Sequence, residues 1–438
     1  MLEKLIHHIT LNFPFLKEKK LLIACSGGID SVVLTRLLKE LKFDISLAHC
    51  NFSLRGKESD GDEKFVVKLA DKLSVPIFTK TFQTKNYANK NGISTQMAAR
   101  DQRYHWFEEL LNTQQFDYLL TAHHLDDDIE TFLINLSRGT GLRGLTGIPS
   151  VNQKTIRPLL HFSRAEILTF AKKNNITWRE DSSNASSYYF RNKLRLEVIP
   201  KLKESSESFL HNFQQTQAYL NESQALVGDY MLLIQNLVLS KTEEGIELNI
   251  HQLKELPNTK ALLFQLLSPY GFTAWEDVLD LLNAQTGKQV FSKTHRLLKN
   301  RKVLLLTEIS EENISESIFI SEEVRQIESP IKLHFEWVSE VSELNNNNTI
   351  YVDFQKLKYP LELRNWKQGD SFYPFGMKGK KKLSKFFKDE KLSLVAKEKV
   401  RVLCTENVIL WVVGLRPDNR FKVDKNTQKI LKITYINL

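Results

Sequence analysis

From Leu21 onward, short runs of apolar residues alternate with longer segments in which apolar residues recur every three or four positions. The short runs predict strands, and the longer segments predict helices. The expected strands are 21–25, 45–49, 75–82, 117–123 and 155–160, and the expected helices are 31–41, 63–73, 94–111 and one opened by a capping box of Ser163 and Glu166. Such alternation is typical of a Rossmann-like α/β fold, a parallel sheet with helices on both faces, whose ligands bind beyond the carboxyl ends of the strands.

Beyond residue 200 the pattern changes. Residues 199–239 are polar with helical spacing and predict a connecting arm, and residues 249–283 predict further helices. Four consecutive asparagines, Asn345–Asn348, favour a loop or boundary, and residues 400–404 and 408–414 predict a β-hairpin. We therefore expect three domains: an α/β domain in residues 1–205, a helical linker with a mainly helical middle domain in residues 206–325, and a small α+β domain in residues 326–438.

The length and composition are those of a globular protein with more than one domain. The chain has 438 residues, of which 42% are hydrophobic and 26% are charged, and a disordered or fibrous chain would depart from such values. No apolar run reaches the roughly 18 residues of a membrane-spanning helix, and the amphipathic N-terminal stretch lacks the apolar centre of a secretion signal. We expect a cytoplasmic protein without a membrane partner.

Three cysteines, Cys25, Cys50 and Cys404, lie far apart in the sequence, without a CxxC pair or a Cys/His cluster. This spacing disfavours a disulfide framework, a zinc site and an iron–sulfur cluster. We expect three buried thiols.

The positive charge is concentrated near the C-terminus. The net charge is +9, and Lys and Arg outnumber Asp and Glu by 11 in residues 351–438, whereas residues 241–350 carry a net charge of −6. A lysine-rich segment of the C-terminal region also contains Tyr373, Phe375, Phe386 and Phe387, and such a mixture suits the backbone and bases of a nucleic acid. An ordinary solvated surface would have the same composition, so both interpretations stay open.

The segment Ser26-Gly27-Gly28-Ile29-Asp30-Ser31 lies between a predicted strand and a predicted helix. Its glycines let the backbone approach an anion, and a helix N-terminus presents unpaired amides and the positive end of its dipole. The segment has neither the Gly-Lys-Ser/Thr of a Walker A loop nor a GxGxxG pattern, so it predicts a phosphate site of another type. A tight glycine turn capped by Ser26 is the structural alternative.

This segment resembles the SGGxDS motif of the PP-loop, or N-type, ATP pyrophosphatases. Further segments resemble, in order, the motifs of the tRNA(Ile)-lysidine synthetase family within that superfamily: His49–Gly56, Ala99–Tyr104, Thr121–Asp127, Arg138–Gly141, and Glu180–Asn184 with Arg191-Asn192. Arg364–Asp370 resembles part of the last domain of the family. One departure is Asp128, which stands where the family commonly has glutamine and adds a carboxylate near the proposed metal site.

The resemblance implies a ligase that uses ATP and magnesium. ATP would adenylylate the 2-oxo group of the wobble cytidine in an isoleucine tRNA with a CAU anticodon, and the amine of L-lysine would then displace AMP. Residues 1–205 would form the PP-loop ATP-binding catalytic domain, and residues 326–438 would bind the tRNA. The oligomeric state stays open, with a homodimer as one option.

The motif matches also imply roles for single residues. The expected ATP ligands are Ser26, Gly27, Gly28, Ile29, Asp30, Ser31, His49, Asn51 and His123. The expected magnesium ligands are Asp30, Asp126 and Asp127, and the expected catalytic residues are Asp30, Asp127, Arg100 and Arg103. The expected tRNA contacts are Arg191, Lys380, Lys381, Lys382 and Lys385.

These roles have structural alternatives. Acidic residues after a strand can simply cap the next helix. Adjacent residues of an extended segment point to opposite faces, so one of His123 and His124 can be a core residue. Arg100 and Arg103, three apart on one helix face, can pair with nearby acidic residues such as Asp101 or Glu108 instead of a phosphate.

Other functions explain less of the sequence. A PP-loop tRNA thiolase would need reactive or cluster-binding cysteines, which the absence of CxxC disfavours. Ammonia-using PP-loop synthetases would need neither the basic C-terminal region nor the arginine and histidine motifs. An RNA-binding protein that only senses ATP would leave Asp30, Asp126 and Asp127 without a role.

Overall fold

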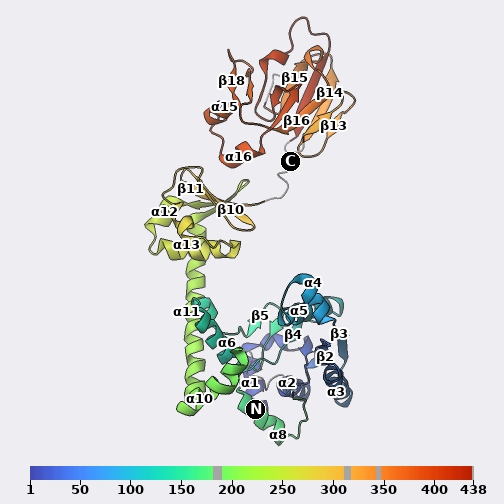
Figure 1. Cartoon of the computed structure of the whole chain (residues 1–438), viewed down its shortest axis with the longest axis vertical. Coiled ribbons are helices and arrows are strands. Elements are labelled where there is room, and N and C mark those ends of the chain that lie inside the picture. The colour runs from blue at the N-terminus through green and yellow to red at the C-terminus, as the bar shows by residue number, and fades with distance from the viewer. Residues whose placement is uncertain (181–189, 310–316, 342–346, 437–438) are drawn as a thin grey trace. The chain divides into compact units, whose positions relative to one another are not determined.

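The computed structural model describes residues 1–180, 190–309, 317–341 and 347–436. The chain divides into two compact units, Met1–Gly228 and Asp229–Leu438 (Figure 1). The motif residues Asp181–Asn184, and Asn345 and Asn346 of the asparagine run, lie outside the described residues. No helix in the described ranges is long and apolar enough to cross a membrane.

The first unit is built on a six-stranded sheet in the order β3-β2-β1-β4-β6-β5. Its strands are β1 (Lys20–Ala24), β2 (Asp44–Asn51), β3 (Ile77–Thr81), β4 (Tyr118–Leu120), β5 (Val151–Asn152) and β6 (Thr155–Ile156). All neighbouring pairs are parallel except β5 and β6, which form a short antiparallel hairpin. The chain passes from β1 outward to β3 and then returns to add β4 on the other side of β1, and this reversal is where such sheets bind ligands.

Helices cover both faces of this sheet. Successive residues of β1 point to opposite faces, and because these residues are apolar, each face needs a covering layer. Leu21 and Ile23 belong to a core shared with α2 (Ile29–Glu40) and α8 (Arg164–Lys173), whereas Leu22 belongs to a second core shared with α5 (Thr95–Thr113). The prediction of a doubly wound α/β sheet is therefore confirmed.

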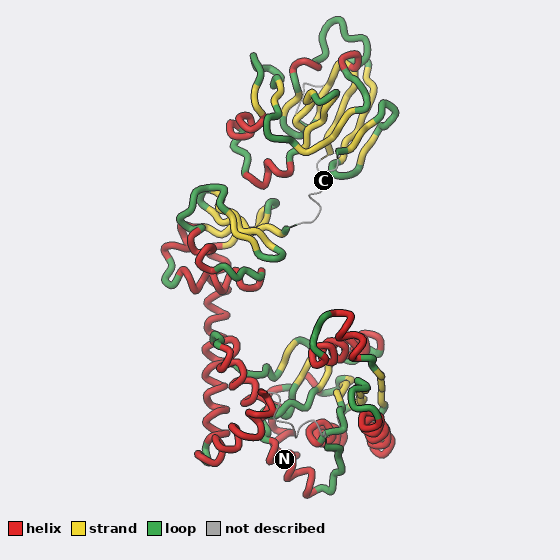
Figure 2. Tube along the Cα trace, viewed as in Figure 1, coloured by secondary structure: helices red, strands yellow, loops and turns green. Residues whose placement is uncertain are grey.

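The remaining helices of this unit include several that the apolar pattern predicted. They are α1 (Leu2–Asn12), α3 (Lys57–Leu73), α4 (Thr84–Asn91), α6 (Leu125–Arg138), α7 (Leu142–Leu145), α9 (Phe190–Lys193), α10 (Ile199–Ser205) and α11 (Phe209–Val238). Helix α11, the predicted polar arm, is the longest red rod in Figure 2 and runs past the unit boundary at Gly228. The capping box of Ser163 and Glu166 is confirmed at the start of α8. Strand β6 is shorter than predicted, because Pro158 has no N–H with which to continue the ladder.

The first part of the second unit combines helices with a sheet. The predicted helices are α12 (Ile250–Glu255), α13 (Thr259–Leu267) and α14 (Trp275–Asp280). They accompany an antiparallel sheet that was not predicted, in the order β7 (Leu239–Thr242), β8 (Gly245–Asn249), β11 (Val303–Glu308), β10 (His295–Asn300) and β9 (Gln289–Phe291).

The C-terminal part consists of two antiparallel sheets that share one core, with short helices beside them. One sheet has the order β12 (Ile318–Ile320), β16 (Leu361–Asn365), β19 (Arg401–Thr405), β20 (Val408–Val412) and β21 (Arg416–Pro417). The other has the order β13 (Gln326–Ile327), β14 (Lys332–Val338), β22 (Ile430–Ile436) and β15 (Thr349–Asp353). The smaller elements are β17 (Ser371–Phe372), β18 (Lys381–Lys382), α15 (Leu383–Asp389) and α16 (Leu394–Lys399). The predicted hairpin is β19–β20, and its turn residues Glu406 and Asn407 both have positive φ, as a tight two-residue hairpin turn requires.

Candidate active site

The predicted phosphate loop joins β1 to α2 beyond the carboxyl end of β1. Gly27 has φ +89°, and a Cβ atom there would lie 3.2 Å from Cγ2 of Val66, so only glycine fits without strain. The Ser31 hydroxyl donates a hydrogen bond to the Gly28 carbonyl (3.0 Å) and lies 3.4 Å from the Ser26 hydroxyl. Gly28 is the N-cap of α2 and has no side chain to occupy the first-turn amides, so these amides remain for an anion.

The loop after β4 meets the phosphate loop through His124. The His124 N–H donates to Oδ2 of Asp127 (3.1 Å), and Nδ1 of His124 accepts from the Asp127 N–H (3.3 Å). Because Nδ1 accepts, the ring proton lies on Nε2, and Nε2 is 3.6 Å from Oδ1 of Asp30. His124 is only 1% exposed and thus connects the phosphate-loop aspartate with Asp127 inside the protein.

The pKa values of Asp30 and Asp127 are shifted in opposite directions. Burial raises the pKa of Asp30, and the negative charge of Asp127 adds to this effect, although His124 and two arginines oppose it. Burial also disfavours the ionised form of Asp127, but His124 and other neighbours, including Arg195, outweigh it, so the pKa of Asp127 is lowered. Oδ1 of Asp30 is buried and has no hydrogen-bond partner in the described part of the chain. A carboxylate oxygen in that position suits a positively charged ligand.

Two arginines, Arg191 and Arg195, form ion pairs in a cluster with Asp127 and Glu130. Arg195 lies in a π-helical turn (Leu194–Val198) and binds Glu130 (2.6 Å) and Asp127 (3.1 Å), and Arg191 of α9 binds Glu130 (2.7 Å). Glu130 is completely buried, so two carboxylates and two guanidinium groups balance one another. Arg191, for which a tRNA contact was predicted, binds Glu130 through its Nε, and 46% of its side chain is exposed.

Both carboxylate oxygens of Asp126 have partners within the protein. Asp126 forms an ion pair with Lys203 and accepts a hydrogen bond from the backbone N–H of Arg164 (2.9 Å). We narrow the predicted site of three carboxylates to Asp30 and Asp127, because His124 lies between these two side chains. No group of three or more His, Cys, Asp or Glu side chains among the described residues could hold a metal alone. Two carboxylates still suit magnesium, which commonly takes its other ligands from phosphates and water.

Asp128, the departure from the family pattern, serves the fold. Its Oδ1 accepts a hydrogen bond from the Ile148 N–H (2.5 Å), and burial raises its pKa to about 6. A Cβ atom at Gly147 would overlap the carboxylate of Asp128, so the loop after α7 approaches α6 closely. Asp128 therefore holds this loop rather than joining Asp30.

The phosphate loop is also supported from the segment that follows α8. The Arg179 N–H donates to the Gly27 carbonyl (2.9 Å), and Arg179 Nε donates to Oδ1 of Asp62 in α3 (2.9 Å). Oδ2 of Asp62 accepts from Arg55 (2.9 Å). Two segments that are distant in sequence, Arg55 with the start of α3 and the segment after α8, thus meet at the loop.

Three other predicted ATP ligands are engaged with the protein. Nδ1 of His49 donates to the Cys25 carbonyl (2.8 Å), and the Asn51 amide binds two carboxylates of α3; both side chains are 3% exposed. His123 pairs with the Thr121 hydroxyl (2.9 Å), and burial is the main cause that lowers its pKa to about 4. We expect any contact of His49 and Asn51 with ATP to come from their backbone groups.

Arg100 and Arg103 lie on one face of α5, as predicted. The guanidinium carbon of Arg100 is 4.9 Å from the centre of the Tyr104 ring, and that of Arg103 is 5.3 Å from the centre of the Phe52 ring. In the described structure neither arginine forms an ion pair with a carboxylate, so the alternative of a helix-surface ion pair is not found. Both charges remain for an anionic ligand.

Comparison with known families tests the resemblance. Residues 1–202 match a model described as a PP-loop domain, residues 241–309 one described as a TilS substrate binding domain, and residues 361–435 one described as a TilS substrate C-terminal domain. A tRNA(Ile)-lysidine synthase from Parabacteroides distasonis is 38% identical over 426 residues, which cover 96% of each chain. The chain belongs to the tRNA(Ile)-lysidine synthase family. Relatives of the same name from Bacteroides thetaiotaomicron (37% identical, 98% of each chain) and Porphyromonas gingivalis (34% identical, 95% of each chain) support this membership.

Membership in the tRNA(Ile)-lysidine synthase family confirms the resemblance and the predicted enzyme class, a ligase with a PP-loop domain. A thiolase is not favoured. The cysteines agree with this, because burial raises the pKa of Cys50 and of Cys404 to about 12 and also raises that of Cys25. Thiols in such surroundings form little reactive thiolate.

The lysine-rich segment of this lysidine synthase is only partly as predicted. Phe386 and Phe387 are buried in a core of the C-terminal part, so the prediction that they stack on nucleic acid is wrong. Phe386 and Phe387 are adjacent on α15 and both are buried, while Lys385, which directly precedes them, stays exposed. Lys380 and Lys382 are also exposed, whereas Lys381 forms an ion pair with Asp389 (2.8 Å).

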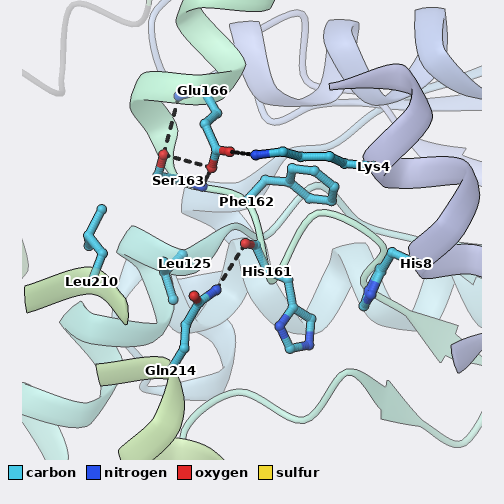
Figure 3. A pocket seen from close by; sticks show the side chains of 9 residues that line it. All are labelled: Lys4, His8, Leu125, His161, Phe162, Ser163, Glu166, Leu210 and Gln214. Atoms are coloured by element: carbon cyan, nitrogen blue, oxygen red, sulfur yellow. Dashed lines mark hydrogen bonds and ion pairs between the residues drawn. The ribbon is translucent and has the colours of Figure 1, made fainter. Parts of the chain in front are cut away.

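A cavity of about 300 Å³ lies between α1, the start of α8 and α11 (Figure 3). Its lining includes Lys4 and Glu166, which are 3.3 Å apart, and the rings of His8 and His161, whose centres are 4.6 Å apart. None of the predicted site residues lines this cavity.

Four site residues were not assigned a role from the sequence: Glu130, Arg195, His124 and Arg179. Asp127 and Glu130 are three apart and Arg191 and Arg195 are four apart, spacings that place each pair on one helix face and would have suggested the charge cluster. His124 was named only as the possible core partner of His123. Arg179 has no local signal, because 117 residues separate it from Asp62.

Proposed function

We propose that this chain ligates L-lysine to the wobble cytidine of an isoleucine tRNA with a CAU anticodon. The 2-oxo oxygen of cytidine attacks the α-phosphorus of ATP, and pyrophosphate leaves. An amine of lysine then attacks C2 of the adenylylated base, loses a proton, and AMP leaves with the oxygen. The observation that supports this best is that His124 joins the phosphate loop to Asp127 at the point where the strand order reverses.

The phosphate loop would hold the pyrophosphate part of ATP. The amides of the first turn of α2, including those of Ile29 and Asp30, and the hydroxyls of Ser26 and Ser31 are hydrogen-bond donors for phosphate oxygens. Their rigid placement means that little reorganisation is needed as charge develops on the leaving group.

Asp30 and Asp127 would hold magnesium, and the unpartnered buried oxygen of Asp30 fits a cation. When bound, magnesium would neutralise negative charge on the phosphates. Asp30 has a second available role, because the same oxygen can accept a hydrogen bond from the incoming amine of lysine. His124 would keep Asp30 and Asp127 in fixed positions relative to each other.

Arg100 and Arg103 would stabilise the anionic transition state. Each guanidinium lies against an aromatic ring and has no carboxylate partner in the described structure, so its charge is oriented and uncompensated. We keep the roles of Asp30, Asp127, Arg100 and Arg103 as those of catalytic residues.

We also propose a division of labour along the chain. Residues 1–205 would carry catalysis, residues 206–325 would form the linker and middle domain, and residues 326–438 would bind tRNA through Lys380, Lys382 and Lys385, with Lys381 and Arg191 contributing. The net charge of +11 in residues 351–438 supports this assignment. We expect the enzyme to work in the cytoplasm, where its substrates occur.

Pyrophosphate release tests the proposal. With tRNA but no lysine, we expect release of about one equivalent per enzyme-bound tRNA, and continued release only when lysine is added. A screen of the other amino acids should give no continued release. The proposed function is wrong if no pyrophosphate appears with any RNA, or if turnover is the same without tRNA.

A further inference from the structure

A cavity of about 650 Å³ lies between α5 and the β5–β6 hairpin, elements that Figure 1 shows next to each other in the first unit. Its volume is in the range of sites that bind a nucleotide-sized ligand. Its charged lining residues are Arg100, Lys154 and Arg157 on the positive side and Asp101 and Glu108 on the negative side. Tyr87, Tyr104 and Asn152 are among its other lining residues.

Arg157 is the unusual member of this lining. It is only 6% exposed, its Nη1 donates to the Pro149 carbonyl (2.6 Å), and its buried Nε has no hydrogen-bond partner among the described residues. It forms no ion pair in the part of the chain that the structure describes. A buried guanidinium without a carboxylate is costly, so such a group usually marks a place where an anionic ligand supplies the missing charge.

Arg100 and Tyr104 connect Arg157 to the predicted catalytic face of α5. The guanidinium carbon of Arg100 lies 4.9 Å from the centre of the Tyr104 ring, and the Tyr104 hydroxyl interacts with Arg157. Burial lowers the pKa of Arg157, Tyr104 opposes this, and the positive charge of Arg100 lowers it further, so the two guanidinium groups sense each other. Two neighbouring cations that share an aromatic residue can bind one phosphate group from two sides.

We propose that this cavity binds a nucleotide of the tRNA, with its phosphate held by Arg157 and Arg100. This inference rests on the proposed function, which supplies an RNA substrate, and it adds to the catalytic Arg100 a second arginine, Arg157, that lies outside the family motifs. The aromatic rings of Tyr104 and Tyr87 give the cavity an apolar wall for the sugar or base. A free nucleotide such as ATP has the same phosphate chemistry, so the test must separate the two sources.

The test measures equilibrium binding of the full-length chain to an isoleucine tRNA transcript and, separately, to ATP without tRNA. We expect Arg157→Gln, whose amide can still donate to the Pro149 carbonyl, to weaken tRNA binding about five- to tenfold and to reduce the slope of log K against log salt by about 1. ATP binding should change less than twofold. Lys80→Gln is the matched control, because Lys80 is a cation of the same unit that pairs with Glu109 and does not line the cavity.

Arg100→Gln is the second variant, because Arg100 is exposed and its replacement does not disturb a core. Arg100→Gln should weaken tRNA binding by a similar factor. In the double variant the fold-loss of tRNA affinity should be smaller than the product of the two single fold-losses, because both residues hold one phosphate. Weaker ATP binding with unchanged tRNA binding would assign the cavity to ATP and overturn the proposal. Unchanged binding of both ligands, or an equal loss in Lys80→Gln, would overturn it as well. A wild-type chain that binds tRNA but releases no pyrophosphate would refute the proposed function and leave this binding test valid.

Discussion

The backbone N–H of Arg179 donates a hydrogen bond to the carbonyl of Gly27 at 2.9 Å and so ties the segment after α8 to the phosphate loop. The Arg179 side chain meanwhile binds Asp62 of α3 at 2.9 Å. Gly27, with φ +89°, is therefore held between Arg179 on one side and Val66 of α3 on the other. The position of the loop depends on contacts made by residues far from it in sequence.

Loss of the Arg179–Asp62 contact should impair ATP binding more than it impairs stability. We expect Arg179→Ala to raise the KM for ATP about fivefold with a smaller change in kcat, and to cost about 1 kcal/mol or less of unfolding free energy because the side chain is 43% exposed. Steady-state kinetics and urea unfolding measure the two effects. Adding Asp62→Asn to the Arg179→Ala variant should raise the KM for ATP little further. Fully additive effects of the two substitutions on KM would show that the two residues act separately.

Asp30 should be needed for adenylylation but not for binding of tRNA. We expect Asp30→Ala to reduce tRNA-dependent pyrophosphate release by about 10³-fold or more while the dissociation constant for tRNA stays within twofold. Asp30→Asn tests the charge alone and should be nearly as inactive. Loss of tRNA binding with intact ATP turnover would contradict this assignment.

Asp128 should make the folded protein less stable above pH 6. Its pKa is raised from the ordinary 3.8 to about 6, so the folded state favours the protonated form, and the stability gained from protonation is full below pH 4 and lost as the pH rises through 6. Asp128→Asn keeps an acceptor for Ile148 and cannot ionise. We expect it to raise the unfolding free energy at pH 8 by up to about 3 kcal/mol, with the gain vanishing near pH 4. Urea unfolding at both pH values measures this, and an equal gain at both would contradict the interpretation.

Glu130 should be essential to the charge cluster beside Asp127. Glu130→Gln would leave Arg195 and Arg191 without their buried carboxylate partner. We expect a loss of about 2 to 3 kcal/mol of unfolding free energy, below the value for fully buried pairs because Arg191 is half-exposed. Glu109→Gln, which breaks the exposed pair with Lys80, is the control and should cost less than about 1 kcal/mol. Equal losses of unfolding free energy in Glu130→Gln and Glu109→Gln would mean that burial does not strengthen the ion pairs of Glu130.

The lysine-rich segment should bind the tRNA backbone. Replacing Lys380, Lys381 and Lys382 with glutamine should weaken tRNA binding and flatten its salt dependence by about 2 units of slope, because Lys381 is already paired with Asp389. Filter binding over a range of salt concentrations measures the slope. An unchanged slope would favour the solvated lysine-rich surface that the composition also allowed.

Local patterns in the sequence were enough to predict the first unit. The alternation of strands and helices, the SGGxDS segment and the capping box of Ser163 depend on contacts within a few residues, and the structure confirms these elements. The prediction was weaker in the middle region, where the sheet of β7 to β11 brings together strands some 50 residues apart that carry no distinctive motif. The interpretation of the Phe386 and Phe387 rings failed for a related reason: the local sequence does not reveal which face of α15 turns inward.

The sequence by itself determined the fold class, the family and the residues of the phosphate loop, because each follows from short motifs or from periodicity. Only the tertiary structure decided the direction of each side chain in the run His123 to Asp128. It turned His124 toward Asp30, Asp127 toward Arg195, Asp126 toward Lys203 and Asp128 toward Ile148. Neighbouring residues at a helix start point in different directions, and their partners come from segments up to about 95 residues away, so burial and charge pairing across the folded chain assign each side chain its role.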